Sequence, residues 1–302
     1  MRTSRFMSKV SEGFCSPKEG VELILRNVFP KILTDETYLR ILTQLRFGHA
    51  LDLKEPKTFN EKLNWQKLHD RNPQYTMMAD KYEVKKIVGD IIGFEYVVPC
   101  YGVWSNFDEI DFDLLPLSFV LKCTHDSSGV IICKNKGDLD KKKAKEIVDR
   151  CLSKNNFWHS REWVYKDIKP RVLVDQYLDD GSGKELRDYK FWCFNGTPMI
   201  MYCTNKAADI FENFYDMDFY PLDISHGFKR QTPEFQKPKE FDLMKNLATK
   251  LSKDIPFVRV DFFDVNGHVY FGEYTFYDWA GLRPFKNEEM DMYLGSLIKL
   301  KK

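Results

Sequence analysis

Charged side chains alternate along a predicted β-hairpin near the C-terminal end of the sequence. Arg259 and Asp261 stand two residues apart in an apolar stretch, so a strand would place both on one face. The returning strand over 268–276 would bring Glu273 and Thr275 alongside them. Two carboxylates on adjacent strands suit Mg²⁺, which also takes phosphate oxygens and water, and an arginine beside them could stabilise a developing anion. A cross-strand ion pair on a solvated sheet face would explain the same pattern.

A lysine lies near the end of a second apolar strand, predicted over 118–123. Lys122 is followed by a short polar loop and then a returning strand. The small loop residues Ser127, Ser128 and Gly129 would let backbone N–H groups approach phosphates closely, with Lys122 supplying a positive charge. The sequence contains neither a Walker A motif nor GxGxxG, which argues against P-loop and Rossmann folds. An ordinary hairpin with an exposed lysine is the alternative.

A third candidate segment begins with an acid at the end of an apolar strand. Asp175 follows the stretch 171–174, and Asp188 and Lys190 follow after a linker. An acid in this position could offer its carboxylate to a ribose, while the neighbouring backbone faces an adenine. A strand-end acid that only caps the chain explains the segment as well.

Hydrophobic periodicity predicts the elements that position these residues. The first part, to residue 75, predicts helices, with Asp35 as the N-cap of the second. Two Asn-Gly pairs, at 195–196 and 266–267, are typical of tight hairpin turns. Helices first and hairpins later predict an α+β fold rather than regular βαβ alternation. The later predicted helices cover 80–88, 139–154, 238–252 and 288–300, and the predicted strands cover 96–104, 118–123, 130–133, 171–174, 189–194, 199–203, 258–263 and 268–273.

Composition excludes several classes of protein. Lys and Arg total 46 and Asp and Glu total 45 among 302 residues. This near-balance argues against a nucleic-acid partner, because neutralising phosphates needs a basic excess. No apolar run is long enough for a membrane span, and the N-terminus lacks the apolar core of a signal peptide. The seven cysteines contain no CxxC pair, which argues against structural zinc and a disulfide framework. We expect a cytoplasmic protein with at most peripheral membrane contact.

The segments in this order resemble the ATP-grasp superfamily. Within it, the sequence is similar to the TupA-like ATP-grasp family, which is linked to teichuronopeptide and other surface-polysaccharide biosynthesis. The resemblance covers residues 55–302. It rests on Asp80-Lys81-Tyr82-Glu83-Val84-Lys85, Leu115-Pro116 with Phe119-Val120-Leu121-Lys122, Lys169-Pro170-Arg171, the run from Asp188 to Gly196, Phe214-Tyr215-Asp216, and Arg259-Val260-Asp261 with the run from Phe271 to Phe276.

The resemblance implies an ATP-grasp fold, in which two α+β subdomains with antiparallel sheets clamp ATP. The implied organisation is a helical N-terminal region over 1–75, a first subdomain over 76–175 and a second subdomain with the metal site over 176–302. The implied enzyme is an ATP-dependent carboxylate–amine ligase that works through an acyl phosphate. Its product would be an amide between an amino acid and the carboxylate of a uronic acid.

The resemblance also assigns roles to single residues. Lys81 and Lys122 would contact the phosphates of ATP, under a loop that includes Ser128 and Gly129. Asp175 and Asp188 would lie near the adenine and ribose, with Lys190 in the same nucleotide site. Asp261 and Glu273 would hold Mg²⁺, and Arg259 would stabilise the charge that develops during transfer. Thr275 stands where many ATP-grasp ligases have Asn, and its hydroxyl would be a weaker metal ligand.

Several functions stay open at this point. The expected partners are an amino acid and a uronic-acid-containing nucleotide sugar or glycan. A peptide-forming ligase that extends an amino-acid chain on a glycan is a close alternative. A phosphotransferase, a glycosyltransferase of polysaccharide assembly and a non-catalytic ATP-binding scaffold are the others.

Overall fold

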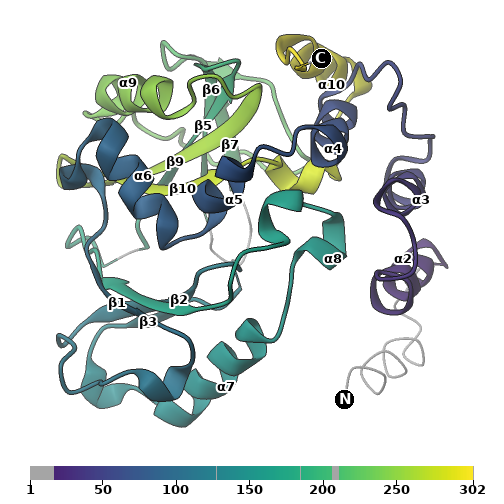
Figure 1. The fold of residues 1–302 in the computed structure, drawn as a ribbon. Coiled ribbons are helices and arrows are strands. Elements are labelled where there is room, and N and C mark those ends of the chain that lie inside the picture. Colours follow the sequence, from purple (N-terminus) through teal and green to yellow (C-terminus); the bar gives the residue numbers. More distant parts are fainter. Residues whose placement is uncertain (1–16, 127, 184, 206–210, 302) are drawn as a thin grey trace.

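The computed structural model describes residues 17–126, 128–183, 185–205 and 211–301 (Figure 1). Two antiparallel sheets dominate it, one of four strands in the order β1-β4-β2-β3 and one of six in the order β10-β9-β5-β6-β7-β8. This arrangement confirms the predicted α+β class. The strands are β1 (Cys100–Trp104), β2 (Phe119–Cys123), β3 (Ile131–Cys133), β4 (Val172–Gln176), β5 (Asp188–Phe194), β6 (Thr197–Asn205), β7 (Phe211–Tyr215), β8 (Pro221–Leu222), β9 (Phe257–Val265) and β10 (His268–Thr275).

Helices lie before, between and after the strands. Those preceding the first strand confirm the helical character predicted for the N-terminal region, although residues 1–16 lie outside the described residues. The helices are α2 (Pro17–Val28), α3 (Asp35–Phe47), α4 (Phe59–His69), α5 (Pro73–Ala79), α6 (Glu83–Ile92), α7 (Lys141–Leu152), α8 (Phe157–Ser160), α9 (Phe241–Leu251) and α10 (Glu288–Leu297), with short 3-10 turns at Phe94–Tyr96, Phe107–Glu109, Lys136–Asp138, Trp163–Tyr165 and Asp278–Gly281.

The six-stranded sheet has two unlike faces, because side chains of a strand alternate between them. One face is apolar and buries residues such as Phe191, Val260 and Phe262 against α5, α6 and α9. The opposite face carries a row of polar side chains across four neighbouring strands. In register, this row is Glu273, Asp261, Lys190 and Tyr202.

The four-stranded sheet is two-faced in the same way. One face packs on α7 through Leu121 and Val174, which lie opposite each other on β2 and β4. The other face carries Lys122 and Asp175. The four-stranded sheet thus separates an apolar face from a charged one. On the six-stranded sheet, the face with the polar row also buries Trp192 and Phe194 against α4 and α10.

The two Asn-Gly hairpins form as predicted. Asn195 and Gly196 have φ values of 49° and 82°, and Asn266 and Gly267 have φ values of 57° and 88°. Positive φ at both central residues is the geometry of the tight turn that matches the twist of antiparallel strands. These turns join β5 to β6 and β9 to β10, and so fix the register of the polar row.

Three local predictions are wrong. The helix predicted over 80–88 is α6 (Glu83–Ile92), because Asp80 instead ends α5. Thr34, not Asp35, caps α3: its Oγ1 accepts a hydrogen bond from the backbone N–H of Thr37 at 3.2 Å, and Asp35 is the first helical residue. The predicted strand 96–104 is shortened to β1, since Phe94–Tyr96 forms a 3-10 turn. Proline at position 99 supplies no N–H for a strand ladder, and its carbonyl instead accepts from the backbone of Gln176.

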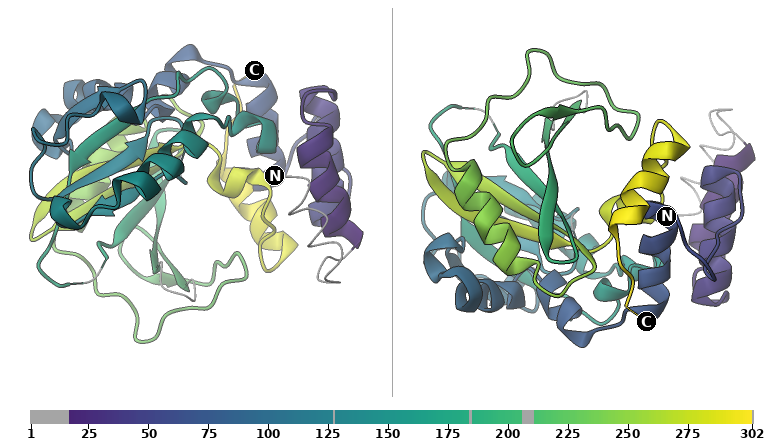
Figure 2. Two further views of the ribbon diagram at one scale, coloured as in Figure 1. Left: turned by 90° about the horizontal axis from the view of Figure 1, so that it is seen from below. Right: turned by 90° about the horizontal axis from the view of Figure 1, so that it is seen from above.

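Helices α2 and α3 (purple) lie at one side of the molecule, beyond α4 and α10, in both views of Figure 2. Tyr38 and Leu42 of α3 are buried with Leu282, which anchors this pair of helices to the C-terminal part of the chain. The predicted boundaries near residues 75 and 175 stay predictions. Within the described ranges, no helix is long and apolar enough to cross a membrane.

Candidate active site

Arg259 binds three carboxylates at one place on the polar face. Its Nε and Nη2 donate to the two oxygens of Asp261, each at 2.7 Å. Nη2 also donates to Glu273 at 2.9 Å, and Nη1 donates to Asp278 at 2.6 Å. The side chain of Arg259 is only 11% exposed. The predicted alternation is therefore correct, but this face is shielded from water rather than solvated, which strengthens each charge interaction.

Lys190 lies opposite Asp261 on the neighbouring strand. Its Nζ is 2.7 Å from Oδ2 of Asp261 and 3.3 Å from Oδ2 of Asp188. Burial acts most strongly and lowers the pKa of Lys190, but Asp261, Asp188 and Glu273 together raise it above its ordinary value, so Lys190 carries a charge at neutral pH. Burial raises the pKa of Asp261, while Arg259 and Lys190 act in the opposite direction. The negative charge of Asp261 thus depends on both cations.

Glu273 is the more accessible of the two carboxylates. Its side chain is 38% exposed, against 4% for Asp261. Nζ of Lys81 lies 4.0 Å from its Oε2, and the hydroxyl of Thr275 donates to its Oε1 at 3.4 Å. Burial acts to raise the pKa of Glu273, but Lys81, Arg259 and Lys190 together lower it. Glu273 is therefore ionised at neutral pH and open to a further cation.

The oxygen atoms here fit a magnesium ion that brings some of its own ligands. Asp261 and Glu273 are cross-strand neighbours, and Thr275 adds a hydroxyl at the same edge. Among the residues that the structure describes, no group of three or more His, Cys, Asp or Glu could hold a metal. Mg²⁺ is commonly held by one or two carboxylates together with substrate phosphates and water. The residues present fit that manner of binding, and the metal stays a prediction.

Asp175 holds two lysines on the charged face of the four-stranded sheet. Its carboxylate is 4% exposed and lies 3.1 Å from Nζ of Lys122 and 2.9 Å from Nζ of Lys85. Lys85 comes from α6, so the carboxylate ties that helix to β2 and β4. A contact of Asp175 with a ribose stays a prediction, since in this structure its oxygens face the two lysines.

The loop after β2 is organised by a buried acid. Asp126 accepts hydrogen bonds from the backbone N–H of Ser128 at 3.0 Å and from its hydroxyl at 2.6 Å. A Cβ on Gly129 would lie 2.6 Å from Sγ of Cys151, so this glycine permits close packing against α7. Ser127 lies outside the described residues. The predicted contacts of Ser128 and Gly129 with phosphates stay predictions, because both residues here serve the packing of the loop.

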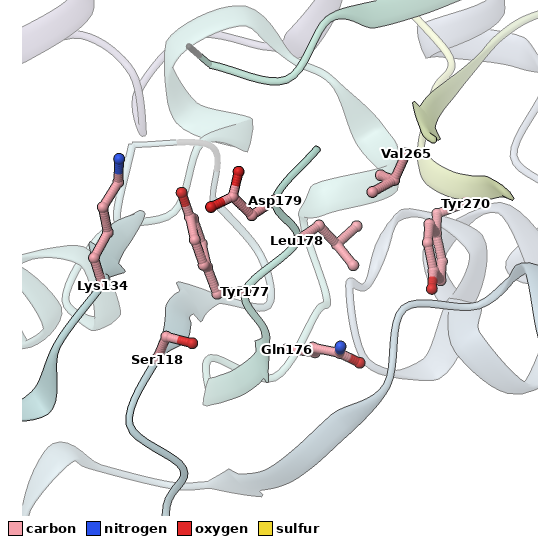
Figure 3. Close-up of a pocket in the computed structure, with 8 residues that line it drawn as sticks. All are labelled: Ser118, Lys134, Gln176, Tyr177, Leu178, Asp179, Val265 and Tyr270. Carbon is pink, nitrogen blue, oxygen red and sulfur yellow. The ribbon is translucent and has the colours of Figure 1, made fainter. Parts of the chain in front are cut away.

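A cavity of about 410 Å³ opens between the two sheets, at the chain segment that follows β4 (Figure 3). Its size is within the range of small-molecule sites. Tyr270 lies in its wall, three residues before Glu273 on β10, so the cavity is about 10 Å along the strand from the carboxylates. The lining residues are Ser118, Lys134, Gln176, Tyr177, Leu178, Asp179, Val265 and Tyr270.

Three residues of the site escaped prediction from the sequence. Tyr202 donates to Asp278 at 3.0 Å, and Asp278 is the third carboxylate on Arg259. Asp278 follows the end of β10, where period-two alternation no longer applies. Lys85 lies on a helix, and only its contact with Asp175 connects it to the site. The alternation of polar residues in β6 could have indicated Tyr202, whereas no local signal marks the other two.

The two facing sheets, the charged row and the cavity between them define an ATP-grasp protein. The family model described as TupA-like ATP-grasp matches residues 61–299, and the chain belongs to this family. This result confirms the predicted family and fold class. A comparison with curated proteins finds no match.

Comparison with solved structures finds ATP-grasp proteins at low similarity. D-alanine–D-alanine ligase from Bacillus anthracis, complexed with ATP, is 15% identical with a TM-score of 0.38, and the match covers 66% of this chain and 53% of that one. The D-alanine–D-alanine ligase from Helicobacter pylori is 15% identical with a TM-score of 0.42, covering 80% and 69%. A RimK domain ATP-grasp protein from Sphaerobacter thermophilus is 13% identical with a TM-score of 0.41, covering 76% and 70%.

Proposed function

We propose that the protein is an ATP-dependent carboxylate–amine ligase that forms an amide between an amino acid and a uronic-acid carboxylate during the assembly of a surface polysaccharide. The observation that carries this proposal is the contact of Arg259 with both Asp261 and Glu273, about one nucleotide length from a cavity between two sheets. Family membership supports the general class. The cytoplasm, where ATP is available, is the compartment we propose for it.

The cavity after β4 suits the nucleoside part of ATP. Tyr177, Leu178 and Tyr270 line it. An adenine could stack on an aromatic ring and bond to backbone groups there. The triphosphate would then extend along β9 and β10 toward Lys190 and Lys81.

The lysine side chains of the site would change their ion-pair partners when the nucleotide binds. Lys81 and Lys190, now paired with Glu273 and Asp261, would turn to phosphate oxygens. The freed carboxylates would hold Mg²⁺, which supplies positive charge next to the leaving phosphates. Lys122 would reach the phosphates from the facing sheet.

The chemistry needs little covalent participation by the protein. The substrate carboxylate attacks the γ-phosphorus, ADP leaves, and an acyl phosphate forms. The amine then attacks the acyl carbon, an amide forms, and phosphate leaves with the proton of the amine passing to solvent. Arg259, held by three carboxylates, would stay in place and stabilise the negative charge in both steps. Positioning and electrostatics would supply most of the rate.

The test is nucleotide turnover by the purified protein with Mg-ATP across pairs of amino acids and uronic acids, free, nucleotide-linked and in glycans. We expect ADP and phosphate only when both an acid and an amine are present. Hydroxylamine in place of the amine should trap the acyl phosphate as a hydroxamate. Omitting the amine or the acid is the matched control.

The other functions give different products in the same assay. A phosphotransferase forms ADP without free phosphate, and a glycosyltransferase consumes a nucleotide sugar whether or not ATP is present. A scaffold binds ATP and forms no ADP with any pair. A peptide-forming ligase requires a second amino acid as the acid. Any of these outcomes would contradict the proposed ligation.

A further inference from the structure

A strained turn lies directly after the catalytic strands. Trp279 and Ala280 have φ values of 47° and 57°, a left-handed conformation that residues other than glycine rarely adopt. The carbonyl of Ala280 accepts from Nζ of the buried Lys67 at 2.6 Å, and the carbonyl of Gly281 accepts from Asn64 at 2.7 Å. Helix α4 therefore holds the backbone in this conformation, and such held strain is often found at functional sites.

The turn separates two neighbouring side chains. Asp278 is fully buried on Arg259, whereas Trp279 remains 38% exposed. Other large apolar side chains are more exposed than Trp279, so its exposure alone assigns it no role. The residues around it are more informative.

Arg283 lies beside the exposed tryptophan. Its guanidinium carbon is 4.7 Å from the ring centre of Trp279 and 3.9 Å from that of Phe228. Nε donates to the carbonyl of His226 at 3.0 Å, which fixes the side chain. In the described part of the chain, Arg283 makes no ion pair with a carboxylate. The guanidinium is thus held in place, partly exposed, and has N–H groups left for an external anion.

The two surfaces together match one kind of ligand. A guanidinium edge binds a carboxylate through two parallel hydrogen bonds, and aromatic neighbours strengthen the pairing by excluding water. The ring of Trp279 offers a flat apolar surface to the C–H groups of a sugar ring. A pyranose that bears a carboxylate presents both complementary surfaces, whereas a free amino acid presents only the carboxylate.

We propose that Arg283, Trp279 and Phe228 form a subsite for an acidic sugar residue, so that the acceptor is an oligomeric or polymeric uronate. The proposal rests on the proposed ligase function and specifies its glycan. Trp279 follows Asp278, which binds Arg259, but its ring contacts Phe228 and Arg283, so the subsite is near the reaction centre in the chain and is not part of it. One uronic acid would react at Arg259 while another residue of the same glycan lies on Trp279.

Titration calorimetry with the nucleotide-free protein tests the subsite directly. The probes are oligosaccharides of glucuronate and of galacturonate, the same oligosaccharides with reduced carboxyl groups, and the monosaccharide acids. We expect an oligouronate to bind at least about tenfold more tightly than its reduced form, as a charged hydrogen-bonded contact would give. Equal binding of the reduced form, binding of monosaccharide and oligomer with equal affinity, or no binding of either oligouronate would overturn the subsite.

Variants assign the binding to the named residues. Arg283→Gln and Trp279→Leu should each weaken oligouronate binding about tenfold or more. Arg283→Lys keeps the charge but loses the planar guanidinium edge, so its affinity for the oligouronate should lie between those of the wild type and Arg283→Gln. This variant tests the assignment if Arg283→Gln does not fold. Lys286→Gln removes an exposed charge three residues away and should change nothing. Unchanged binding in both Arg283 variants would refute the assignment.

The same proteins separate this inference from the ligase function. If the wild type forms ADP with an acid and an amine, yet Arg283→Lys and Arg283→Gln keep the preference for oligomers, the subsite is wrong and the ligase stands. If the oligouronate binds through Arg283 but no pair of substrates yields ADP, the subsite stands and the ligase is wrong.

Discussion

Arg259 and Asp278 form a buried ion pair between a strand and the turn that follows the next strand. Nη1 of Arg259 lies 2.6 Å from Oδ1 of Asp278, whose side chain is fully buried. The other oxygen, Oδ2, accepts no hydrogen bond in the described structure. Arg259 is therefore the main compensation for this buried charge, and the two residues fix each other's position.

Asp278→Asn keeps the shape of the side chain and removes its charge. Arg259 then loses one of three carboxylates that orient it, so we expect kcat to fall about tenfold, with the Kd for ATP unchanged. Steady-state kinetics and ATP titration measure both. Asp291→Asn is the matched control, because Asp291 is also buried but binds Asn60 on α4. An equal loss of kcat in the control would indicate a general effect of lost stability.

Glu273→Gln should separate turnover from nucleotide binding. The amide cannot supply the negative charge for a metal, so we expect kcat to fall by about a hundredfold or more, and the ATP Kd to change far less. Asp264→Asn, in the same hairpin near its turn, is the control and should keep full activity. Full activity in Glu273→Gln would refute the metal assignment.

Lys122→Ala and Lys85→Ala form a matched pair, because both lysines bind the carboxylate of Asp175. If Lys122 contacts phosphates, its removal should weaken ATP binding about tenfold or more, as loss of a charged hydrogen bond would. Lys85→Ala should lower stability without an equal loss of ATP affinity. Equal ATP affinities in wild type and Lys122→Ala would count against the phosphate role.

Because Lys67 is buried, we expect the free energy of unfolding to depend on pH. Its Nζ is buried and donates to carbonyls of Ser160 and Ala280, and burial lowers its pKa to about 7 although the Glu162 carboxylate opposes the shift. Above pH 7 the folded protein releases a proton that the unfolded chain keeps up to its ordinary pKa of 10.5. The free energy of unfolding should therefore rise with pH, by about 1 kcal/mol per unit above pH 7, and show no such slope below it.

Lys67→Met isolates this contribution. Because it leaves buried carbonyls without a donor, we expect the variant to be less stable at pH 7 by about 1–3 kcal/mol. Urea unfolding of both proteins at pH 6, 7, 8 and 9 gives the difference in free energy. That difference should be flat from pH 6 to 7 and should grow above pH 7. A difference independent of pH would mean that Lys67 keeps its proton in the folded state.

Local patterns in the sequence predicted the elements well where the cause of the structure is itself local. The Asn-Gly turns formed at both positions because only two residues and their φ values decide such a turn. The strands on either side followed from alternation. The predicted N-cap of α3 was wrong by one residue, because Thr34 and Asp35 can both act as N-caps and the backbone conformation selects between them.

The same distinction between local and long-range causes applies to the residues of the site. The sequence by itself determined that Arg259 and Asp261 share a face, because strand periodicity is a property of one segment. Only the tertiary structure decided that Lys190 lies against Asp261, that Asp278 reaches Arg259, and that Asp175 faces two lysines. Strand order and register depend on packing between segments far apart in the chain, and no local pattern contains that information.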